Sequence, residues 1–384
     1  MTETMIGPYT AFAAKEILGE GPGELSFRNP RFHGLADWRD QARAKALGMV
    51  AQPDTGESPK AEVVRRTVVE GVEVELLRWQ LSFGPPTEGV FLKPEGAKGP
   101  LPGVVALHDH GGLKYFGWRK IADDGRPVHP MLREHRDQDY GGRAWANELA
   151  RRGYAVLCHD CFPFASRRIL VSQVAEHLRW GKARDVTEAE ESEDIAAYNQ
   201  WAAQHEHIVA KVLFAAGTTW PGIFTFDDRR AVEVLCARPE VDPERIGCSG
   251  LSGGGCRTLF LGGLDLRIKC AICVGMMTTW RDLVTRKCGN HTWMMWVPGL
   301  PKYLDYPEIL GLRVPLPTMV LNNNEDPLFT LLEMHRADGI LRAVYEKAGA
   351  PERYACQFYP GPHKFDAQMQ GDAFAWFDRW LKRE

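Results

Sequence analysis

A serine, an aspartate and a histidine in the second half of the chain have the types and the order that nucleophilic catalysis needs. They are Ser252, Asp326 and His363. A serine is a weak nucleophile at neutral pH, and it becomes effective when a histidine accepts its proton and an acidic side chain orients that histidine. The three residues therefore predict covalent catalysis by a serine, provided that the fold brings their side chains together.

Ser252 lies in the stretch Gly250-Leu251-Ser252-Gly253-Gly254, which matches the pattern Gly-x-Ser-x-Gly. This pattern is typical of a sharp turn between a strand and a helix, where the backbone at the serine is strained and the residues two positions away must be small. The flanks fit, because "ERIGCSG" predicts a strand and "GGCRTLFLGGL" predicts a helix. Ser249 is the rival nucleophile, but Leu251 stands two positions after it, where a side chain would collide.

The acid and the histidine are each predicted to follow a later strand. The segment "LPTMVLNNN" indicates a strand that ends shortly before Asp326, and "YACQFYPG" indicates one that ends shortly before His363. His335 also lies beyond Asp326, but it falls inside a helical pattern. Glu325 remains open as the acid, and we favour Asp326.

Two backbone N–H groups are expected to stabilise the oxyanion of the tetrahedral intermediate. We assign one to Gly253, which follows the serine at the N-terminus of a helix, where negative charge is favoured. We assign the other to Gly112, in the segment "LHDHGG" after an early strand. His108 and His110 of that segment are interpreted as braces of the loop, because no third metal ligand is evident. The predicted chemistry requires neither a metal nor a cofactor.

These residues need a scaffold, and the pattern of the chain predicts one of the α/β class. From about residue 100 onward strand-like and helix-like segments alternate, which is typical of a mostly parallel sheet with helices on both faces. A valine-rich segment before them predicts a β-hairpin that turns near Glu70-Gly71. We divide the chain into an N-terminal helical extension, 1–60, and a catalytic domain, 61–384.

A helical insertion at about 162–222 interrupts this alternation. Its apolar residues recur at helical spacing, and Thr187 with Glu190 forms a capping-box pattern. We expect the insertion to cover Ser252 and narrow the pocket, with Trp220 in contact with the acyl group. Four tryptophans are candidates for stacking on a sugar ring, with core packing as the alternative: Trp220, Trp280, Trp293 and Trp296.

The composition excludes several classes of protein. The chain has 384 residues and a formal net charge of −3, so neither nucleic acid nor a membrane is an expected partner. No signal peptide or membrane span is evident. Nine cysteines in a long chain favour reduced thiols and a cytoplasmic location. Association with further copies of the chain is left open.

Two cysteine pairs have the spacing of metal ligands. They are Cys158/Cys161 and Cys270/Cys273. Both pairs overlap strand-like segments, and strand positions three residues apart face opposite sides of a sheet. Because they could not then hold one zinc ion together, we interpret them as thiols of the core.

The chain resembles the α/β-hydrolase superfamily, and within it the branch of dienelactone-hydrolase-like proteins and acetyl xylan esterases. The resemblance rests on "PGVVALHDHGG", "ERIGCSGLSGGG", "LPTMVLNNNEDPLF" and "YPGPHKFD", and it extends over roughly residues 60–384 without the insertion. It implies a serine esterase that cleaves small carboxylic esters, acetylated sugars among them. Dienelactone hydrolases proper are shorter and have cysteine at the position of Ser252.

Two other functions remain open at this stage. A peptidase of the prolyl-oligopeptidase type has the same order of residues, but such enzymes usually carry a β-propeller, for which the N-terminal segment is too short. A non-catalytic binding protein with this fold usually lacks one of the three residues, and none is missing here. We therefore expect a cofactor-independent hydrolase of a small-molecule carboxylic ester.

Overall fold

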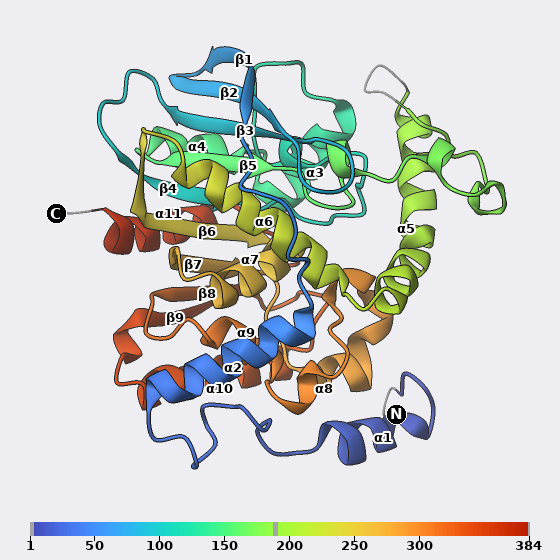
Figure 1. Cartoon of the computed structure of the whole chain (residues 1–384), viewed down its shortest axis with the longest axis vertical. Helices are drawn as coiled ribbons and strands as arrows, with labels where there is room; N and C mark the ends of the chain where they lie inside the picture. Colours follow the sequence, from blue (N-terminus) through green and yellow to red (C-terminus); the bar gives the residue numbers. More distant parts are fainter. Residues whose placement is uncertain (1–3, 187–190, 383–384) are drawn as a thin grey trace.

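The computed structural model describes residues 4–186 and 191–382, and its centre is one nine-stranded sheet. The strands lie in the order β1-β2-β3-β5-β4-β6-β7-β8-β9 (Figure 1). Their bounds are Glu62–Val69 (β1), Val72–Trp79 (β2), Thr87–Pro94 (β3), Leu101–Ala106 (β4), Ala155–His159 (β5), Val241–Leu251 (β6), Ile268–Val274 (β7), Thr318–Asn323 (β8) and Tyr354–Tyr359 (β9).

The pairing of the strands determines where a ligand can bind. β1, β2 and β3 form an antiparallel meander, and β3 also pairs antiparallel with β5. From β5 onward, β4, β6, β7, β8 and β9 are parallel, so that their carboxyl ends meet at one edge. The predicted mostly parallel sheet is therefore confirmed. In such sheets ligands bind outside the carboxyl ends of the strands.

The hairpin predicted near Glu70-Gly71 joins β1 to β2. Val69 pairs with Val72 across the turn. Glu70 and Gly71 have φ values of 47° and 77°. Two successive residues with positive φ make the turn whose twist matches that of the strands.

Helices cover both faces of the sheet. The buried side chains of α2, α6, α7, α9 and α10 share one hydrophobic cluster with the strands, and those of α4 and α11 share a second. The helix bounds are Tyr9–Phe12 (α1), Leu35–Val50 (α2), Pro130–Tyr140 (α3), Trp145–Arg151 (α4), Ser192–Ala215 (α5), Trp220–Cys236 (α6), Gly253–Leu264 (α7), Trp280–Asp282 (α8), Tyr306–Gly311 (α9), Leu331–Lys347 (α10) and Ala367–Leu381 (α11). Figure 1 shows α2, α6 and α7 in front of the strands.

None of the helices in the described ranges is, by itself, both long and apolar enough to cross a membrane. Helices α5 and α6 meet the requirement of length and hydropathy only as a pair, with a bend of 86° between them.

The segment predicted as an N-terminal extension packs against the rest of the molecule through α2. Trp38 in this helix is completely buried. Its Nε1 donates a hydrogen bond to the Leu25 carbonyl at 2.6 Å, and its ring stacks on Phe27 at 4.5 Å. Because α2 belongs to the same hydrophobic cluster as the central strands, it forms a layer of the main core.

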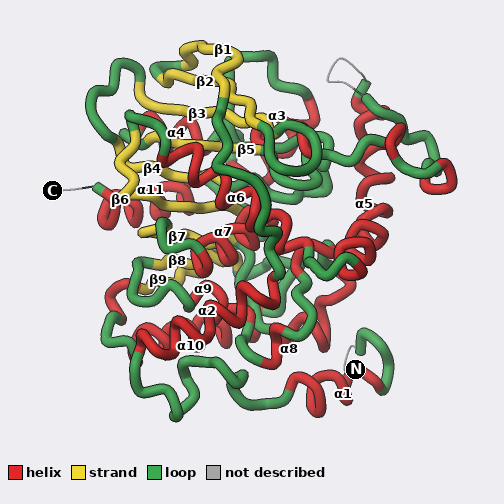
Figure 2. The backbone as a smooth tube through the Cα atoms, viewed as in Figure 1, coloured by secondary structure: helices red, strands yellow, loops and turns green. Residues whose placement is uncertain are grey.

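The insertion begins with short 3₁₀ turns in an irregular segment and continues as α5, which stands at the right-hand edge of the molecule (Figures 1 and 2). Ile195, Tyr198 and Trp201 of α5 are buried against Tyr115 and Leu132, in a cluster separate from the sheet. The apolar stripe predicted for this helix thus packs on the loop after β4 and on α3. The capping-box residues Thr187 and Glu190 lie outside the described residues.

Candidate active site

Ser252 occupies the turn between β6 and α7 that the sequence predicts. β6 ends at Leu251 and α7 begins at Gly253, so that Ser252 is the N-cap residue of the helix. Its φ of 58° and ψ of −116° are strained for a residue with a side chain. The Ser252 N–H donates to the Val274 carbonyl at 2.9 Å, and the Ser252 carbonyl accepts from the Cys256 N–H at 2.8 Å. These bonds hold the strained conformation in place.

The glycines around Ser252 are required by close backbone contacts. A Cβ atom at Gly250 would lie 2.3 Å from the Leu107 carbonyl oxygen, and one at Gly254 would lie 2.1 Å from the same oxygen. Either side chain would collide with Leu107, the residue that follows β4. The rival Ser249 lies within β6 and is buried, with 1% of its surface exposed.

Asp326 and His363 meet beyond the ends of neighbouring strands β8 and β9. The His363 Nδ1 lies 2.6 Å from the Asp326 Oδ2. The other carboxylate oxygen of Asp326 accepts the Leu328 N–H at 2.9 Å, which fixes the carboxylate. Glu325 is exposed to solvent, and its backbone N–H donates to the Gly361 carbonyl at 3.1 Å. The structure thus brings Asp326, the favoured acid, to the histidine.

The surroundings of His363 favour its protonated form. Burial lowers the pKa of His363, but the hydrogen bond and charge of Asp326, together with the charges of Asp139 and Asp109, outweigh burial and raise the pKa above its ordinary value. The ring packs against Gly275, where a Cβ would lie 2.9 Å from the His363 Cε1. Gly275 therefore leaves the space that the imidazole occupies.

Ser252 and His363 line the same cavity, which has a volume of about 690 Å³. No hydrogen bond joins these two described residues directly, and the His363 Nε2 has no hydrogen-bond partner in the described part of the chain. This nitrogen faces away from Asp326 because Nδ1 holds the carboxylate. It is therefore free to accept a proton, and catalytic hydrogen bonds often tighten only when substrate is bound.

The loop after β4 lies beside Ser252, but it does not present Gly112 as predicted. The Gly112 N–H donates to the His110 Nδ1 at 3.1 Å, so this donor is already engaged within its own loop. The backbone nitrogen of His110 lies close to the turn at Ser252 instead. A Cβ atom built on Gly253 would lie 2.7 Å from this nitrogen. Across 4–186 and 191–382 no backbone carbonyl accepts a hydrogen bond from the His110 N–H.

Glu206 of α5 connects the insertion to this loop. Its Oε1 accepts hydrogen bonds from the Lys114 Nζ and from the His110 Nε2, the latter at 2.7 Å. Its Oε2 accepts from the Thr292 Oγ1 at 2.6 Å and from the Trp293 N–H at 3.1 Å. Burial raises the pKa of Glu206, but the hydrogen bonds and charges of His110 and Lys114 hold it well below its usual range. The prediction that His110 braces the loop is confirmed.

Sequence reasoning missed Glu206, although a signal was present. The residue interrupts the apolar stripe of α5, four positions after Ala202 and three before Val209. A carboxylate on the buried face of a helix indicates a buried partner, because an unpaired buried charge is very costly. The partners lie in distant segments and could not be named from the sequence.

The cavity has chemically different sides. Helix α3 contributes Glu134, His135, Gln138 and Asp139, and α5 contributes Ala203 and Glu206. The apolar side is formed by Met276, Met294, Met295, Leu328 and Phe329. Lysine and arginine are absent from the described residues that line it. The cavity thus offers acceptors for hydroxyl groups on one side and an apolar surface on the other.

The prediction that Trp220 contacts the acyl group was wrong, and none of the four candidate tryptophans lines this cavity. Trp220 is completely buried at the start of α6 and packs edge-on against Phe162, with ring centroids 5.8 Å apart. It lies outside the cavity that Ser252 lines, as do Trp280, Trp293 and Trp296. The physical reason is that Trp220 and Trp280 are buried in the core and Trp293 is exposed outside the cavity, while methionines line the cavity.

One group of described side chains has donors close enough together to hold a metal ion, and it is already hydrogen-bonded. Asp109, His135 and Asp139 bring their donor atoms within 4.8 Å of one another. The His135 Nε2 lies 3.1 Å from Asp109 and its Nδ1 lies 3.2 Å from Asp139. Tyr140 and Lys120 occupy the remaining positions around Asp109, at 2.6 and 3.4 Å. The two Cys-x-x-Cys pairs are buried free thiols.

Comparison with known proteins agrees with the fold. A family model for acetyl xylan esterases matches residues 185–290. The chain is 27% identical over 311 residues to a protein of Bacillus subtilis (strain 168) named "Putative hydrolase YtaP", covering 80% of this chain and 88% of that protein.

Two solved structures have the same fold at low identity. A glucuronoyl esterase from Solibacter usitatus superposes with a TM-score of 0.64 at 14% identity, covering 94% of this chain and 97% of that chain. An acetyl xylan esterase from Paenibacillus sp. R4 superposes with a TM-score of 0.50 at 17% identity, covering 96% and 99%.

The sheet, the turn at Ser252 and these similarities show that the chain has the α/β-hydrolase fold, as the sequence resemblance implied. The comparisons support a carboxylic ester hydrolase similar to acetyl xylan esterases.

Proposed function

We propose that the enzyme hydrolyses esters of short carboxylic acids through an acyl-enzyme on Ser252. His363 removes the proton of the Ser252 hydroxyl as the oxygen attacks the acyl carbon, and it then donates that proton to the leaving alcohol. Asp326 holds His363 in the orientation that exposes Nε2. Water, activated by the same histidine, releases the acid. This proposal rests chiefly on one observation, which is the 2.6 Å Asp326–His363 pair beside a strained serine in one cavity.

We assign the oxyanion to two backbone N–H groups, those of Gly253 and His110. Gly253 is the first residue of α7, where the N–H groups of the helix have no partner within the helix. His110 replaces the predicted Gly112, whose N–H is engaged by the His110 ring. Donors fixed in advance at the developing charge each contribute about 10²- to 10³-fold in kcat.

A labelling experiment tests the nucleophile. A fluorophosphonate probe is expected to modify wild-type enzyme at Ser252. The S252A variant is expected to lose both labelling and about 10⁶-fold in turnover, the loss seen when the serine nucleophile of subtilisin is removed. The matched control is S249A, which removes a nearby hydroxyl buried in β6. Labelling at Ser249, or retained turnover in S252A, contradicts the proposal.

We further propose that the alcohol part of the substrate is a carbohydrate. The α3 side of the cavity carries carboxylate and amide oxygens, which accept hydrogen bonds from sugar hydroxyls. The lining residues in the described ranges carry no cationic side chain that would select a carboxylate. The measurement is the release of acetate from acetylated xylo-oligosaccharides, compared with p-nitrophenyl acetate. A kcat/KM for the sugar esters far below that for the aryl ester contradicts the carbohydrate assignment and leaves the esterase assignment intact.

A further inference from the structure

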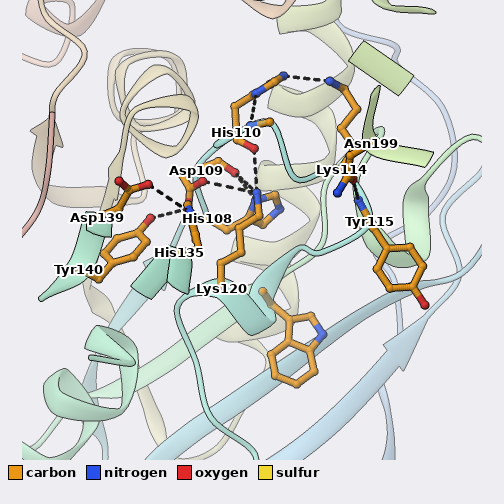
Figure 3. A network of polar contacts seen from close by, with 12 residues as sticks. His108, Asp109, His110, Lys114, Tyr115, Lys120, His135, Asp139, Tyr140 and Asn199 are labelled. Carbon is orange, nitrogen blue, oxygen red and sulfur yellow. Dashed lines mark hydrogen bonds and ion pairs between the residues drawn. The ribbon is translucent and has the colours of Figure 1, made fainter. Parts of the chain in front are cut away.

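Lys120 is a completely buried lysine whose ammonium group contacts the loop beside Ser252. It is the last residue of the 3₁₀ turn Trp118–Lys120, and 0% of its surface is exposed. The Nζ lies 2.9 Å from the Asp109 carbonyl oxygen and 2.9 Å from the His110 carbonyl oxygen (Figure 3). It also lies 3.4 Å from the Asp109 Oδ2. All three contacts are made to two consecutive residues of one loop.

The bond to the Asp109 carbonyl determines which way the next N–H points. The cis peptide bonds of the described chain both precede prolines, so the Asp109–His110 peptide is trans. In a planar trans peptide the C=O and the N–H point in opposite directions. Lys120 holds the carbonyl together with the His108 Nδ1, which lies 3.0 Å from the same oxygen. The His110 N–H is therefore directed away from these two groups. Gly253 lies close to the His110 nitrogen. A Cβ atom built on Gly253 would lie 2.7 Å from this nitrogen.

The charge of Lys120 also acts on the strength of this donor. A cation at a carbonyl oxygen polarises the amide, and hydrogen bonds in a chain strengthen one another where the dielectric is low. The surroundings are shielded from bulk solvent, because Lys120, Asp109 and His108 are all buried. The ammonium is balanced by the Asp109 carboxylate, which is in turn held by His135 and Tyr140.

We propose that Lys120 is a positioning residue for the oxyanion, because it orients and polarises the Asp109–His110 peptide so that the His110 N–H binds the developing charge. This inference rests on the proposed esterase function. Lys120 touches no reacting atom, and its effect is confined to the step in which negative charge appears. Loss of the ammonium therefore weakens binding of the transition state more than binding of the substrate.

The variant K120M tests the proposal with p-nitrophenyl acetate as substrate. We expect kcat to fall about 10²-fold with KM within about threefold of wild type, since one oxyanion donor contributes about this much. A trifluoromethyl ketone forms a hemiketal with the Ser252 hydroxyl, and the ionised hemiketal oxygen imitates the oxyanion. Its affinity for K120M should be lower than for wild-type enzyme by a similar factor. The corresponding amide, which binds without attack, should bind both enzymes equally.

A second lysine, Lys347, binds backbone carbonyls in the same way but is exposed, and it provides the control. The Lys347 Nζ also binds two backbone carbonyls, those of Phe27 at 2.6 Å and Asn29 at 3.0 Å, away from the cavity. The K347M variant is expected to keep wild-type kcat and ketone affinity. A fall in K347M as large as that in K120M would show a general effect of removing a carbonyl-binding lysine.

The outcomes separate this inference from the proposed function. If wild-type enzyme neither cleaves esters nor labels at Ser252, the proposed function fails. If wild-type enzyme does both and K120M has wild-type kcat, or loses ketone and amide affinity equally, the role of Lys120 is overturned. Circular dichroism tests whether K120M is folded. Where it is not, K120Q, which keeps an uncharged N–H donor, is measured in its place, and failure of both variants to fold assigns Lys120 a structural role and overturns the proposal.

Discussion

At the scale of single residues, the contact between Asp326 and His363 carries the first prediction. Asp326→Asn keeps the shape of the side chain but removes the charge that orients the imidazole. We expect turnover of p-nitrophenyl acetate to fall by up to about 10⁴-fold while the enzyme stays folded. Glu325→Gln is the control, because Glu325 is exposed and its neighbour holds the histidine. Greater damage from the Glu325 variant would place the acid one residue earlier.

The second prediction concerns the pH dependence that His363 imposes. The histidine acts as a base only when it is neutral, so activity is lost as the pH falls through its pKa. Since the net effect of its surroundings is to raise that pKa, the acid limb of kcat/KM should lie above the pH expected for an unperturbed histidine.

Asp139→Asn tests this limb, because the Asp139 charge is one of the causes that raise the pKa of His363. Removing the charge lowers the pKa, and the acid limb should move to lower pH with the plateau rate reduced little. Asp137→Asn, on the exposed side of the same helix, is the control. A limb that moves to higher pH, or does not move, contradicts this account.

Part of this site could be predicted from the sequence. Asp326 and His363 each follow a strand, and parallel strands bring their ends to one edge, so their contact follows from chain order. The choice between Gly112 and His110 could not be predicted. It depends on the contacts that the loop makes with Lys120 and with Glu206, the latter 96 residues away from His110. Nothing local in the sequence indicates that a histidine ring will capture the Gly112 N–H.

At the scale of elements, α5 carries the third prediction, because its Ala203 lines the cavity that contains Ser252. Ala203→Leu adds bulk there, so esters with larger groups should lose more kcat/KM than acetyl esters. The ratio of kcat/KM for acetyl esters to that for larger esters should rise about tenfold, which is the discrimination that one methylene group gives in a pocket. Val212→Leu is the control, since Val212 of the same helix is 61% exposed. An unchanged profile across p-nitrophenyl esters would remove α5 from specificity.

The elements around the cavity were not all predictable. The alternation of strands and helices indicated the sheet, but α3 was missed because its sequence, "PMLREHRDQDY", is polar and lies between β4 and α4. Signals of its ends were present: Pro130 stands at the first position, capped by His129, and Gly141 follows the last residue with a φ of 62°. The consequence was functional, because α3 supplies the polar side of the cavity.

At the scale of the whole molecule, the N-terminal segment carries the fourth prediction. Trp38 joins α2 to the core cluster that includes the central strands. Trp38→Ala should therefore lower the free energy of unfolding by about 3–5 kcal/mol, as for other buried aromatic side chains. Urea unfolding measures the change. Trp293→Ala, at a site 37% exposed, is the control and should cost much less. Equal small losses would make α2 a peripheral attachment.

The shared contact of Gly250 and Gly254 with the Leu107 carbonyl has a consequence for genetics. One oxygen atom packs against both sides of the nucleophile turn, so the serine and the loop that carries His110 cannot be displaced independently. A methyl group at either glycine moves both at once. In a double-mutant cycle, G250A and G254A should show an interaction energy well beyond the few tenths of a kcal/mol of distant sites. The active site would therefore change by coordinated substitutions in two segments, and single steps in either would be lost to selection.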